Sequence, residues 1–185
     1  NHPNVIALLE ARRLSYVVCH MEEWGLPQSR VRVIAGTPHI IRRFQGLRNP
    51  AKSVAVADVL PLPVPGARVK GSTANYSAAT KPGRVNRVVP KIRRCRCASK
   101  PSLTVIGVGH NLVWCDANGD TLRQLSVEEN AVLQGFPPNY IFNEMRTLAQ
   151  VEVGDAFPPL IAKLLMENYR LPFDVWPALP PPAVF

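Results

Sequence analysis

Residues 25–36 have the sequence Gly25-Leu26-Pro27-Gln28-Ser29-Arg30-Val31-Arg32-Val33-Ile34-Ala35-Gly36. Gly25 and Pro27 indicate a loop, because glycine permits unusual backbone angles and proline lacks the backbone N–H that regular structure needs. Apolar residues then recur between charged or small residues over Val31–Gly36, which is typical of a strand with its apolar side against a core. The stretch therefore predicts a loop that leads into a strand.

Upstream, apolar residues recur at helical spacing over residues 3–14, after a proline near the start, and this pattern predicts a helix. These residues are Val5, Ile6, Leu8, Leu9 and Leu14. Residues 15–20 contain Tyr16-Val17-Val18-Cys19, a signal for a short buried strand. Helix, strand, loop and strand in this order are typical of the late portion of an α/β sheet.

The chain has 185 residues, of which 46% are hydrophobic and 19% charged, so it can bury a core. Its length fits one domain, or one domain and a piece of another. No apolar run approaches the roughly 18 to 20 residues of a membrane-spanning helix, which excludes that class of protein. The sequence begins at Asn1 without a signal-peptide pattern, so we expect residues to be missing before it.

The positive charge is concentrated in one segment. Of the 22 lysines and arginines, 14 lie in residues 42–100, where Asp58 is the only acidic residue. This segment carries +13 and the rest of the chain −4, within a net charge of +9. Such a segment repels itself unless it faces a polyanion, usually nucleic acid, and it has too few aromatic residues to stack single strands. We expect contact with a duplex backbone; the alternative is a solvated surface loop.

Regular patterning is weak over residues 37–100. Residues 51–60 predict a short helix, prolines follow it, and the remainder indicates a small irregular domain or long loops, with a strand-like piece at residues 87–89. Order returns at residues 103–108, which predict a strand, and Asn118-Gly119 predicts a turn.

The C-terminal part predicts two helices. Ser126 stands three residues before Glu129, the pattern of a capping box, and the helix that follows is expected to stop at Gly135. A last helix is expected after Gly154-Asp155. Its apolar face consists of Leu160, Ile161, Leu164, Leu165 and Tyr169.

Three segments together resemble the C-terminal half of the DNA cytosine-5 methyltransferases. Residues 25–32 resemble the Gln-x-Arg-x-Arg block of that family. Residues 123–129 with Leu133-Gln134-Gly135-Phe136-Pro137 resemble the block that follows its target-recognition domain, and Gly154-Asp155-Ala156-Phe157-Pro158-Pro159 resembles its closing Gly-Asn-Ala-Val-Pro-Pro block. The blocks occur in the order of the family and at plausible spacing, and the resemblance spans roughly residues 4–169.

The resemblance implies a fold and a reaction. The fold is the C-terminal part of a Rossmann-like α/β domain that uses S-adenosyl-L-methionine (AdoMet), with a small irregular target-recognition domain inserted. In the reaction, a cytosine is flipped out of the duplex and attacked at C6 by a thiolate, and a fixed cation at O2 stabilises the charge that develops on the ring. Arg32 is then the candidate for O2, with Arg30 supporting it and Gln28 orienting the loop.

The cofactor side of the site is implied by the closing block, which in the family lies beside the AdoMet pocket. Asp155 and Ala156 are therefore the candidates for binding AdoMet. Asp155 departs from the usual Asn of the family. An ionised acid cannot donate a hydrogen bond as the amide does, and it repels the carboxylate of the cofactor. Its alternative role is to cap the helix that follows.

Other candidate residues also have structural interpretations. Arginines at a strand end can simply solvate an edge, which is the alternative for Arg32. The resemblance implies that Arg123 and Glu129 hold the recognition domain in place against the catalytic domain. The capping box, however, gives Glu129 a role in the start of the helix itself. We favour a structural role for both residues. Residues 134–137 likewise read first as helix termination and packing.

Several motifs of the family have no match in the chain. These are the Gly-rich AdoMet loop, the Pro-Cys nucleophile and the Glu-Asn-Val block. We expect Cys19 and Cys115 to be small core residues. Cys95 and Cys97 are too close for the usual zinc pair, and the histidines share no ligand spacing, so no metal site is predicted.

The domain organisation follows from the blocks. We expect residues 1–40 to be the late part of the catalytic domain, residues 41–120 the basic recognition domain, residues 121–170 the return to the catalytic domain, and residues 171–185 a proline-rich tail. The candidates for DNA binding are Arg68, Lys70, Lys81, Arg84, Arg87, Lys91, Arg93 and Arg94.

The sequence leaves two classes of function open. The first is a segment of an AdoMet-dependent DNA cytosine-5 methyltransferase whose N-terminal half, in the same polypeptide or in a separate subunit, supplies the thiolate and the Gly-rich loop. The second is a module that binds duplex DNA without chemistry. Within the first class an RNA substrate is a further possibility, against which the basic insert argues.

Overall fold

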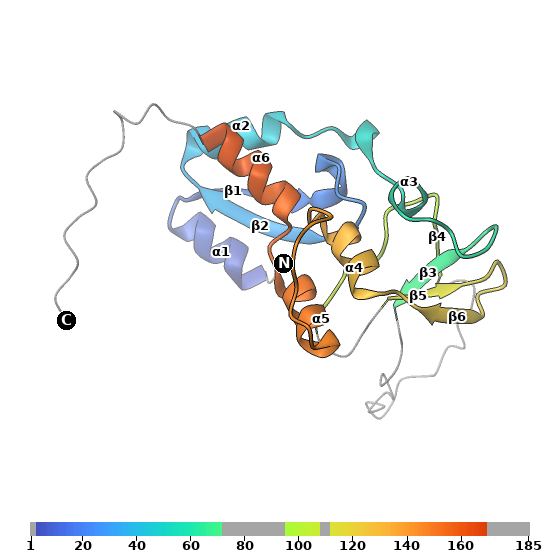
Figure 1. Cartoon of the computed structure of the whole chain (residues 1–185). Helices are drawn as coiled ribbons and strands as arrows, with labels where there is room; N and C mark the ends of the chain where they lie inside the picture. The colour runs from blue at the N-terminus through green and yellow to red at the C-terminus, as the bar shows by residue number, and fades with distance from the viewer. Residues whose placement is uncertain (1–2, 72–94, 108–111, 170–185) are drawn as a thin grey trace, which may run out of the picture.

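The computed structural model describes residues 3–71, 95–107 and 112–169, which form a mixed helix and sheet structure (Figure 1). In chain order the elements are α1 (Pro3–Ala11), β1 (Ser15–His20), the 3-10 helix η1 (Met21–Trp24), β2 (Val31–Gly36), α2 (Pro38–Gly46), the 3-10 helix η2 (Pro50–Lys52), α3 (Val56–Val59), β3 (Arg68–Gly71), β4 (Arg96–Cys97), β5 (Leu112–Cys115), β6 (Thr121–Gln124), α4 (Val127–Gln134), α5 (Arg146–Asp155) and α6 (Pro159–Tyr169). The expected piece at residues 87–89 and the expected tail at 171–185 lie outside the described residues.

The N-terminal part is built on an antiparallel ribbon of β1 and β2, with Ser15 opposite Gly36 and His20 opposite Val31. Both strands have the predicted bounds. Helices α2 and α6 lie beside the ribbon (Figure 1) and contribute Phe44 and Ile161 to its core. The indole ring of Trp24 stacks on Phe44 at 5.0 Å and donates a hydrogen bond to its carbonyl oxygen, which joins η1 to α2.

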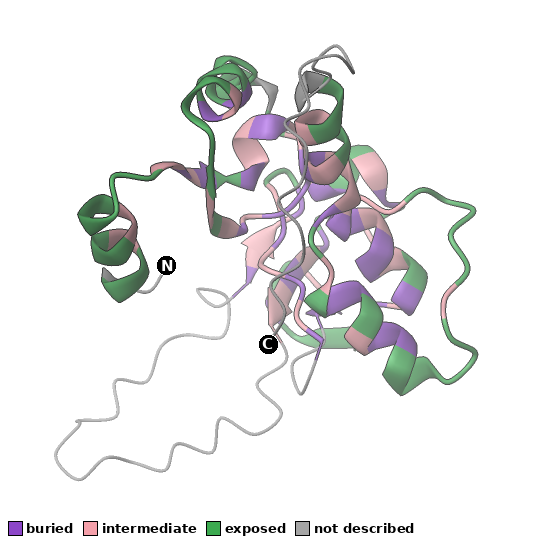
Figure 2. Ribbon diagram, turned by 90° about the vertical axis from the view of Figure 1, so that its left-hand side faces the viewer, coloured by how far each residue is buried: buried purple, intermediate pink, exposed green. Residues whose placement is uncertain are grey.

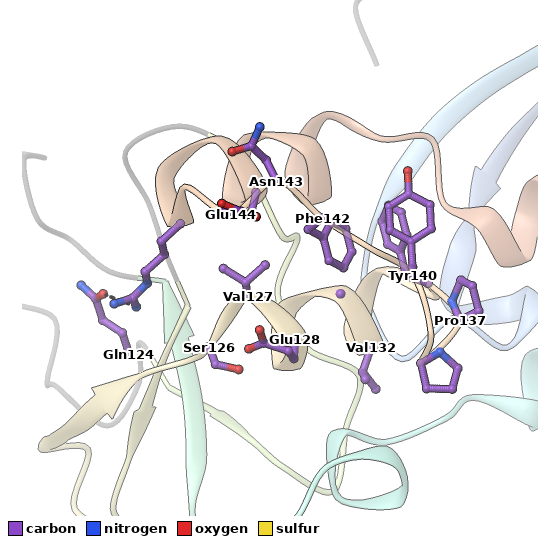
Figure 3. Close-up of a pocket in the computed structure, with 15 residues that line it drawn as sticks. Gln124, Ser126, Val127, Glu128, Val132, Pro137, Tyr140, Phe142, Asn143 and Glu144 are labelled. Carbon is purple, nitrogen blue, oxygen red and sulfur yellow. Dashed lines mark hydrogen bonds between the residues drawn. The ribbon is translucent and has the colours of Figure 1, made fainter.

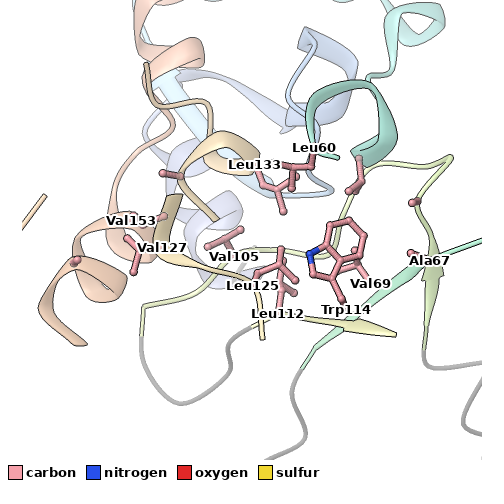
Figure 4. Close-up of a cluster of buried hydrophobic side chains, with 14 residues drawn as sticks. Leu60, Ala67, Val69, Val105, Leu112, Trp114, Leu125, Val127, Leu133 and Val153 are labelled. Atoms are coloured by element: carbon pink, nitrogen blue, oxygen red, sulfur yellow. The ribbon is translucent and has the colours of Figure 1, made fainter. Parts of the chain in front are cut away.

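The second part is an antiparallel sheet of four strands in the order β4-β3-β5-β6. Because side chains alternate across a strand, the two faces of this sheet carry different residues: one packs against the main core cluster, and the other carries a small buried cluster of Cys95, Val113 and Cys115. Val69 and Trp114, which are paired, are fully buried on the face against the main cluster, together with Leu112. Figure 4 shows these side chains in one cluster with residues of α4 and α5, including Leu133 and Val153.

Helix α4 forms as the sequence predicts. The Ser126 hydroxyl accepts a hydrogen bond from the Glu129 amide, and the Glu129 carboxylate accepts one from the Ser126 amide, so the capping box is confirmed. The helix ends at Gly135, whose φ of 82° lies in the left-handed region that favours glycine. The turn at Asn118-Gly119 is also confirmed, with φ of 88° at Gly119.

Four expectations about secondary structure are wrong in whole or part. The strand expected at residues 103–108 is absent over residues 103–107, which form an extended segment outside any strand. The helix expected over residues 3–14 ends at Ala11, and that expected over residues 51–60 is replaced by η2 and α3. Gly154 and Asp155 end α5, an unpredicted helix, so Asp155 does not cap α6.

The described strands all pair antiparallel, and an isolated parallel bridge between Gln28 and Ser102 lies outside these strands. The mixed architecture is consistent with an α/β methyltransferase domain, while the Rossmann-like sheet and the inserted recognition domain stay predictions. The expected boundary at residue 120 falls in the turn between β5 and β6, and the division into domains also stays a prediction. Within the described ranges, every helix is too short or too polar to cross a bilayer.

Candidate functional site

The loop before β2 is held by Gln28, whose side chain is fully buried. Its Nε2 donates hydrogen bonds to the Leu133 carbonyl at 3.1 Å and to Oε1 of Gln134 at 2.6 Å. Its Oε1 accepts a hydrogen bond from the Val105 amide at 2.8 Å. Gln28 therefore ties the loop to the end of α4 and to the segment at residues 105–107, while its orienting role in the reaction stays a prediction.

Arg30 is also buried, with 4% of its surface exposed. Its guanidinium donates to the carbonyls of Val105 at 2.8 Å and Gly154 at 3.2 Å, and its Nε has no hydrogen-bond partner. Burial, and to a lesser extent the charge of Arg32, lower the pKa of Arg30 to about 10, while Asp155 acts in the opposite direction. Arg30 thus joins the first motif block to the closing block.

Arg32 differs from both neighbours because its side chain is exposed on β2. The one hydrogen bond found for it goes from Nη1 to the carbonyl of Val31, the adjacent residue. Gln28 and Arg30 fix the backbone on which Arg32 stands, and they leave its guanidinium accessible to an anionic or carbonyl ligand. The structure places these three residues on one loop and strand start that is anchored through Gln28 and Arg30.

The closing block contacts the same loop through Gly154, which is buried within α5. A Cβ atom at this position would overlap the backbone of Ile106 and Gly107, so the close approach of the two segments requires glycine. Asp155 is exposed and lies beside Gly107, and the Ala156 carbonyl accepts a hydrogen bond from Gln134 at 2.8 Å. The two cofactor candidates therefore lie next to the segment that anchors Arg30.

Arg123 and Glu129 form an ion pair with two contacts, at 2.7 Å and 2.8 Å. The Glu129 carboxylate also accepts a hydrogen bond from the indole N–H of Trp114 at 3.1 Å. Burial raises the pKa of Glu129, but the hydrogen bonds from Arg123, the Ser126 amide and Trp114 outweigh burial and lower it overall. These contacts join β5, β6 and α4, as expected for a structural pair.

Of the candidates for DNA binding, the described residues include Arg68 and Lys70. Both stand on β3, on the face of the sheet opposite Val69, and both are partly exposed. Lys70 donates a hydrogen bond to the Gly119 carbonyl at 3.2 Å. The other candidates, Lys81, Arg84, Arg87, Lys91, Arg93 and Arg94, lie outside the described residues.

Sequence reasoning missed a pocket of about 780 Å³ between α4, the segment leading into α5 and the start of α5 (Figure 3). Phe136 packs edge-on against Tyr140 and Phe142, and these rings form much of its apolar wall. Glu128 and Arg146 add charge at its rim. The rings of residues 136–142 are the signal in the sequence that could have indicated it.

The four cysteines are free thiols in different environments. Cys19 and Cys115 are fully buried, as expected. Burial, helped by Glu23 and Glu22, raises the pKa of Cys19 to about 12, and burial raises that of Cys115 to about 11. Cys97 is partly exposed, and a hydrogen bond from Ser99 lowers its pKa. In the part of the chain that the structure describes, no three His, Cys, Asp or Glu side chains gather in a way that could hold a metal ion.

The family model of the C-5 cytosine-specific DNA methylases matches residues 64–170, more than half of the chain. The chain belongs to this family. Two of the three motif blocks seen in the sequence lie inside the matched range, and the Gln28–Arg32 block lies before it. This confirms the resemblance to the cytosine-5 methyltransferases.

Curated type II methyltransferases are also similar to this family member. One is M1.HphI of Haemophilus parahaemolyticus, 36% identical over 70 residues, which are 38% of this chain and 18% of that protein. Another is M.Bpa9945I of Bacillus paralicheniformis, 46% identical over 43 residues, which are 23% of this chain and 10% of that protein. The chain thus matches less than a fifth of the length of either methyltransferase.

Proposed function

We propose that this chain is the C-terminal segment of an AdoMet-dependent DNA cytosine-5 methyltransferase. It supplies recognition of duplex DNA, the arginine that contacts the flipped cytosine and one wall of the cofactor pocket. The nucleophilic cysteine and the Gly-rich AdoMet loop come from an N-terminal half, carried by the same polypeptide or by a separate subunit. Membership in the C-5 cytosine methylase family supports the class of reaction.

The observation that carries the proposal is the contrast between Arg32 and its neighbours. Gln28 and Arg30 are buried and hydrogen-bonded, whereas Arg32 is exposed two residues further along the same anchored segment. An accessible guanidinium on an anchored backbone suits stabilisation of charge on a cytosine ring, because the side chain starts close to where the charge develops. Arg32 therefore contacts cytosine O2, and Arg30 and Gln28 position it.

On the cofactor side, the proposal assigns Asp155 and Ala156 to the AdoMet pocket. AdoMet supplies the methyl group when it is bound, and the residues here would hold one side of it. The carboxylate of Asp155 lies close enough to Arg30 for the two opposite charges to attract each other. This attraction supports a role for an acid at this position. The partly balanced charge reduces the repulsion that an ionised Asp155 would exert on the cofactor carboxylate.

On the DNA side, residues 41–120 form the recognition domain, between the catalytic parts at residues 1–40 and 121–170. The concentration of positive charge in residues 42–100 supports this assignment. The proposed contacts to the duplex are Arg68, Lys70, Lys81, Arg84, Arg87, Lys91, Arg93 and Arg94. Phosphate contacts from such residues position a protein on DNA without reading its sequence.

The test mixes the chain with the N-terminal half of a family member and measures transfer of labelled methyl groups from AdoMet to duplex DNA. We expect transfer with both parts present and none with either alone. Arg32→Ala should lower the rate by about 100-fold or more, whereas Arg12→Ala, an exposed arginine outside the motif blocks and the basic segment, should leave the rate unchanged.

The outcomes separate the candidate functions. Duplex binding without transfer by a folded pair would favour the non-catalytic DNA-binding module over the enzyme. If Arg32→Ala leaves the transfer rate unchanged, the assignment of Arg32 to cytosine O2 is refuted, while the rest of the proposed function stands. Methylation of tRNA in preference to duplex DNA, in direct competition, would identify RNA as the substrate.

A further inference from the structure

A second pocket lies where the loop before β2 meets the edge strand β4. It has a volume of about 600 Å³ and is open to solvent. Glu22 and Ser29 contribute to it from the N-terminal part, and Ser53, Arg68, Arg96 and Lys100 contribute from the basic segment. The pocket thus joins the Gln28–Arg32 block to the proposed recognition region, through residues that are 24 (Ser29 to Ser53) to 78 (Glu22 to Lys100) positions apart in sequence.

The lining is positively charged. It carries three cations, Arg68, Arg96 and Lys100, against the single carboxylate of Glu22. Among the described residues, none of these three cations forms an ion pair with a carboxylate. Their charge therefore stays uncompensated within the described structure, which favours an anionic ligand.

Two of the cations are held in place by the fold. Arg96 donates hydrogen bonds from Nη1 to the carbonyls of Pro101 and Ser102, at 3.2 Å and 3.1 Å. Arg68 stands on the inner strand β3, opposite Cys97 of β4, and its Nη2 donates a hydrogen bond to the Cys95 carbonyl at 3.5 Å, while its buried Nε has no hydrogen-bond partner. Fixed guanidinium groups lose little conformational entropy on binding a phosphate.

Glu22 is the one like charge that an anion would meet. One of its oxygens accepts a hydrogen bond from the Ser29 hydroxyl at 3.2 Å, and the other is buried without a partner. The three positive charges outnumber this carboxylate, so attraction to a phosphate prevails.

We propose that this pocket binds a phosphate of the duplex DNA backbone through Arg68, Arg96 and Lys100. The proposal rests on the proposed function and extends it by adding Arg96 and Lys100 to the contacts. Ser29 lies in the pocket and Arg30 follows it in the chain, so a phosphate bound here sets the distance between the DNA backbone and Arg32. A contact of this kind fixes register, which the flipping of a chosen base needs.

Cys97 provides a reporter for occupancy of the pocket. It lines the pocket and is partly exposed, and its thiol accepts a hydrogen bond from Ser99 at 3.2 Å. The other three cysteines of the chain are buried. Iodoacetamide should therefore alkylate Cys97 first, and a bound phosphate should slow that reaction.

The first experiment measures binding of the full chain to a duplex of about 30 base pairs at several salt concentrations. Lys100→Gln should weaken binding and make the slope of log K against log salt shallower by about 1. Lys100→Arg should restore the slope, and Lys163→Gln, at an exposed position of α6, should leave it unchanged. Lys100 is exposed, so these variants should fold, which thermal unfolding checks.

The second experiment follows alkylation of Cys97 by mass spectrometry. The rate without any addition is compared with the rates in the presence of duplex DNA, tRNA or inorganic phosphate, each at the same total concentration of phosphate groups. We expect saturating duplex to slow the reaction about tenfold and the other two to have little effect. Equal protection by inorganic phosphate would identify a free-phosphate site, and stronger protection by tRNA an RNA site; either result overturns the proposal.

Failure of this proposal and failure of the proposed function give different results. If wild-type chain binds duplex and supports methyl transfer, while Lys100→Gln keeps the salt slope and Cys97 stays reactive, the pocket proposal alone is wrong. If the wild-type chain binds no duplex at any salt concentration, the proposed function is wrong as well.

Discussion

At the scale of single residues, Gly154 has no room for a side chain. The segment at residues 106–107 passes so close that any Cβ would overlap its backbone, and backbone cannot move aside as the end of a flexible side chain can. Val105, which directly precedes this segment, and Gly154 itself supply the carbonyls that accept hydrogen bonds from Arg30. The fit around Gly154 therefore maintains the anchor of the Gln28–Arg32 block.

We predict that Gly154→Ala lowers the free energy of unfolding by about 3 kcal/mol, because overpacking forces the backbone apart. Urea denaturation followed by circular dichroism measures this change. Gly46→Ala is the matched control, since a Cβ at Gly46 meets nothing within 4 Å, and its effect should stay within about 0.5 kcal/mol. Equal stability of the two variants would contradict the close approach at Gly154.

Glu129 is a second residue on which several contacts converge. We predict that Glu129→Gln lowers the free energy of unfolding by about 2 kcal/mol at pH 7, since the ion pair with Arg123 is lost and the cap is weakened. The exposed pair of Lys163 and Glu167, at 3.8 Å, is the control, and Glu167→Gln should cost less than about 0.5 kcal/mol.

The contribution of Glu129 should depend on pH. Its pKa is lower in the folded protein than in the unfolded chain, so the stabilisation is present above the unfolded value of about 4.3 and is lost as the pH falls through the folded value. The difference in stability between wild type and Glu129→Gln should therefore shrink below about pH 4. Denaturation at a series of pH values tests this, and a difference that grows on acidification would refute the assignment.

At the scale of elements, hydrogen bonds between side chains connect segments that share no sheet. Gln28 bonds to the end of α4 through Leu133 and Gln134, and Gln134 continues to Ala156 between α5 and α6. Both glutamines are fully buried, so each lost bond leaves a polar group without a partner. This network holds the loop before β2 against the two closing helices.

We predict that Gln28→Ala and Gln134→Ala each lower the free energy of unfolding by about 2 kcal/mol, because buried partners become unsatisfied. In a double-mutant cycle the two changes should couple by about 1 kcal/mol, as expected of residues in direct contact. Strictly additive effects would show that the contact between Nε2 of Gln28 and Oε1 of Gln134 contributes no stability.

At the scale of the whole molecule, charge and hydrophobic cores are distributed differently. One core cluster joins β1, η1, α2 and α6, and the other joins the four-stranded sheet with α4 and α5. The basic segment at residues 42–100 runs from α2 through β4, and so belongs to both parts. Helix α1 is mostly exposed and adds little to either core (Figure 2).

From this charge distribution we predict that binding to duplex DNA weakens steeply with salt. If at least four of the 14 cations contact phosphates, log K should fall with log salt at a slope of about −3.5 or steeper. Fluorescence anisotropy of a labelled duplex measures the affinity at salt concentrations from about 50 to about 200 mM. A flat dependence would contradict an electrostatic DNA interface.

Part of the fold could be predicted because nearby residues decide it. The bounds of β1 and β2 follow from local alternation, and the start and end of α4 follow from Ser126, Glu129 and Gly135. Helix α5 was missed because its buried residues, such as Gln150 and Val153, make no strong helical pattern and form a helix where they pack against α4. Residues 103–107 look like a strand, but none of the strands in the described part of the chain pairs with them.

The sequence by itself determined the family motifs, their order, the capping of α4 and the concentration of charge, since each depends on residues close together in the chain. Only the tertiary structure decided that Gln28 and Arg30 are buried while Arg32 is exposed, and that Ser29 shares a pocket with Arg68, Arg96 and Lys100. The physical reason is that burial and the pairing of distant groups depend on which segments pack together. Packing of this kind is set by the hydrophobic cores of the whole chain, and local pattern alone does not encode it.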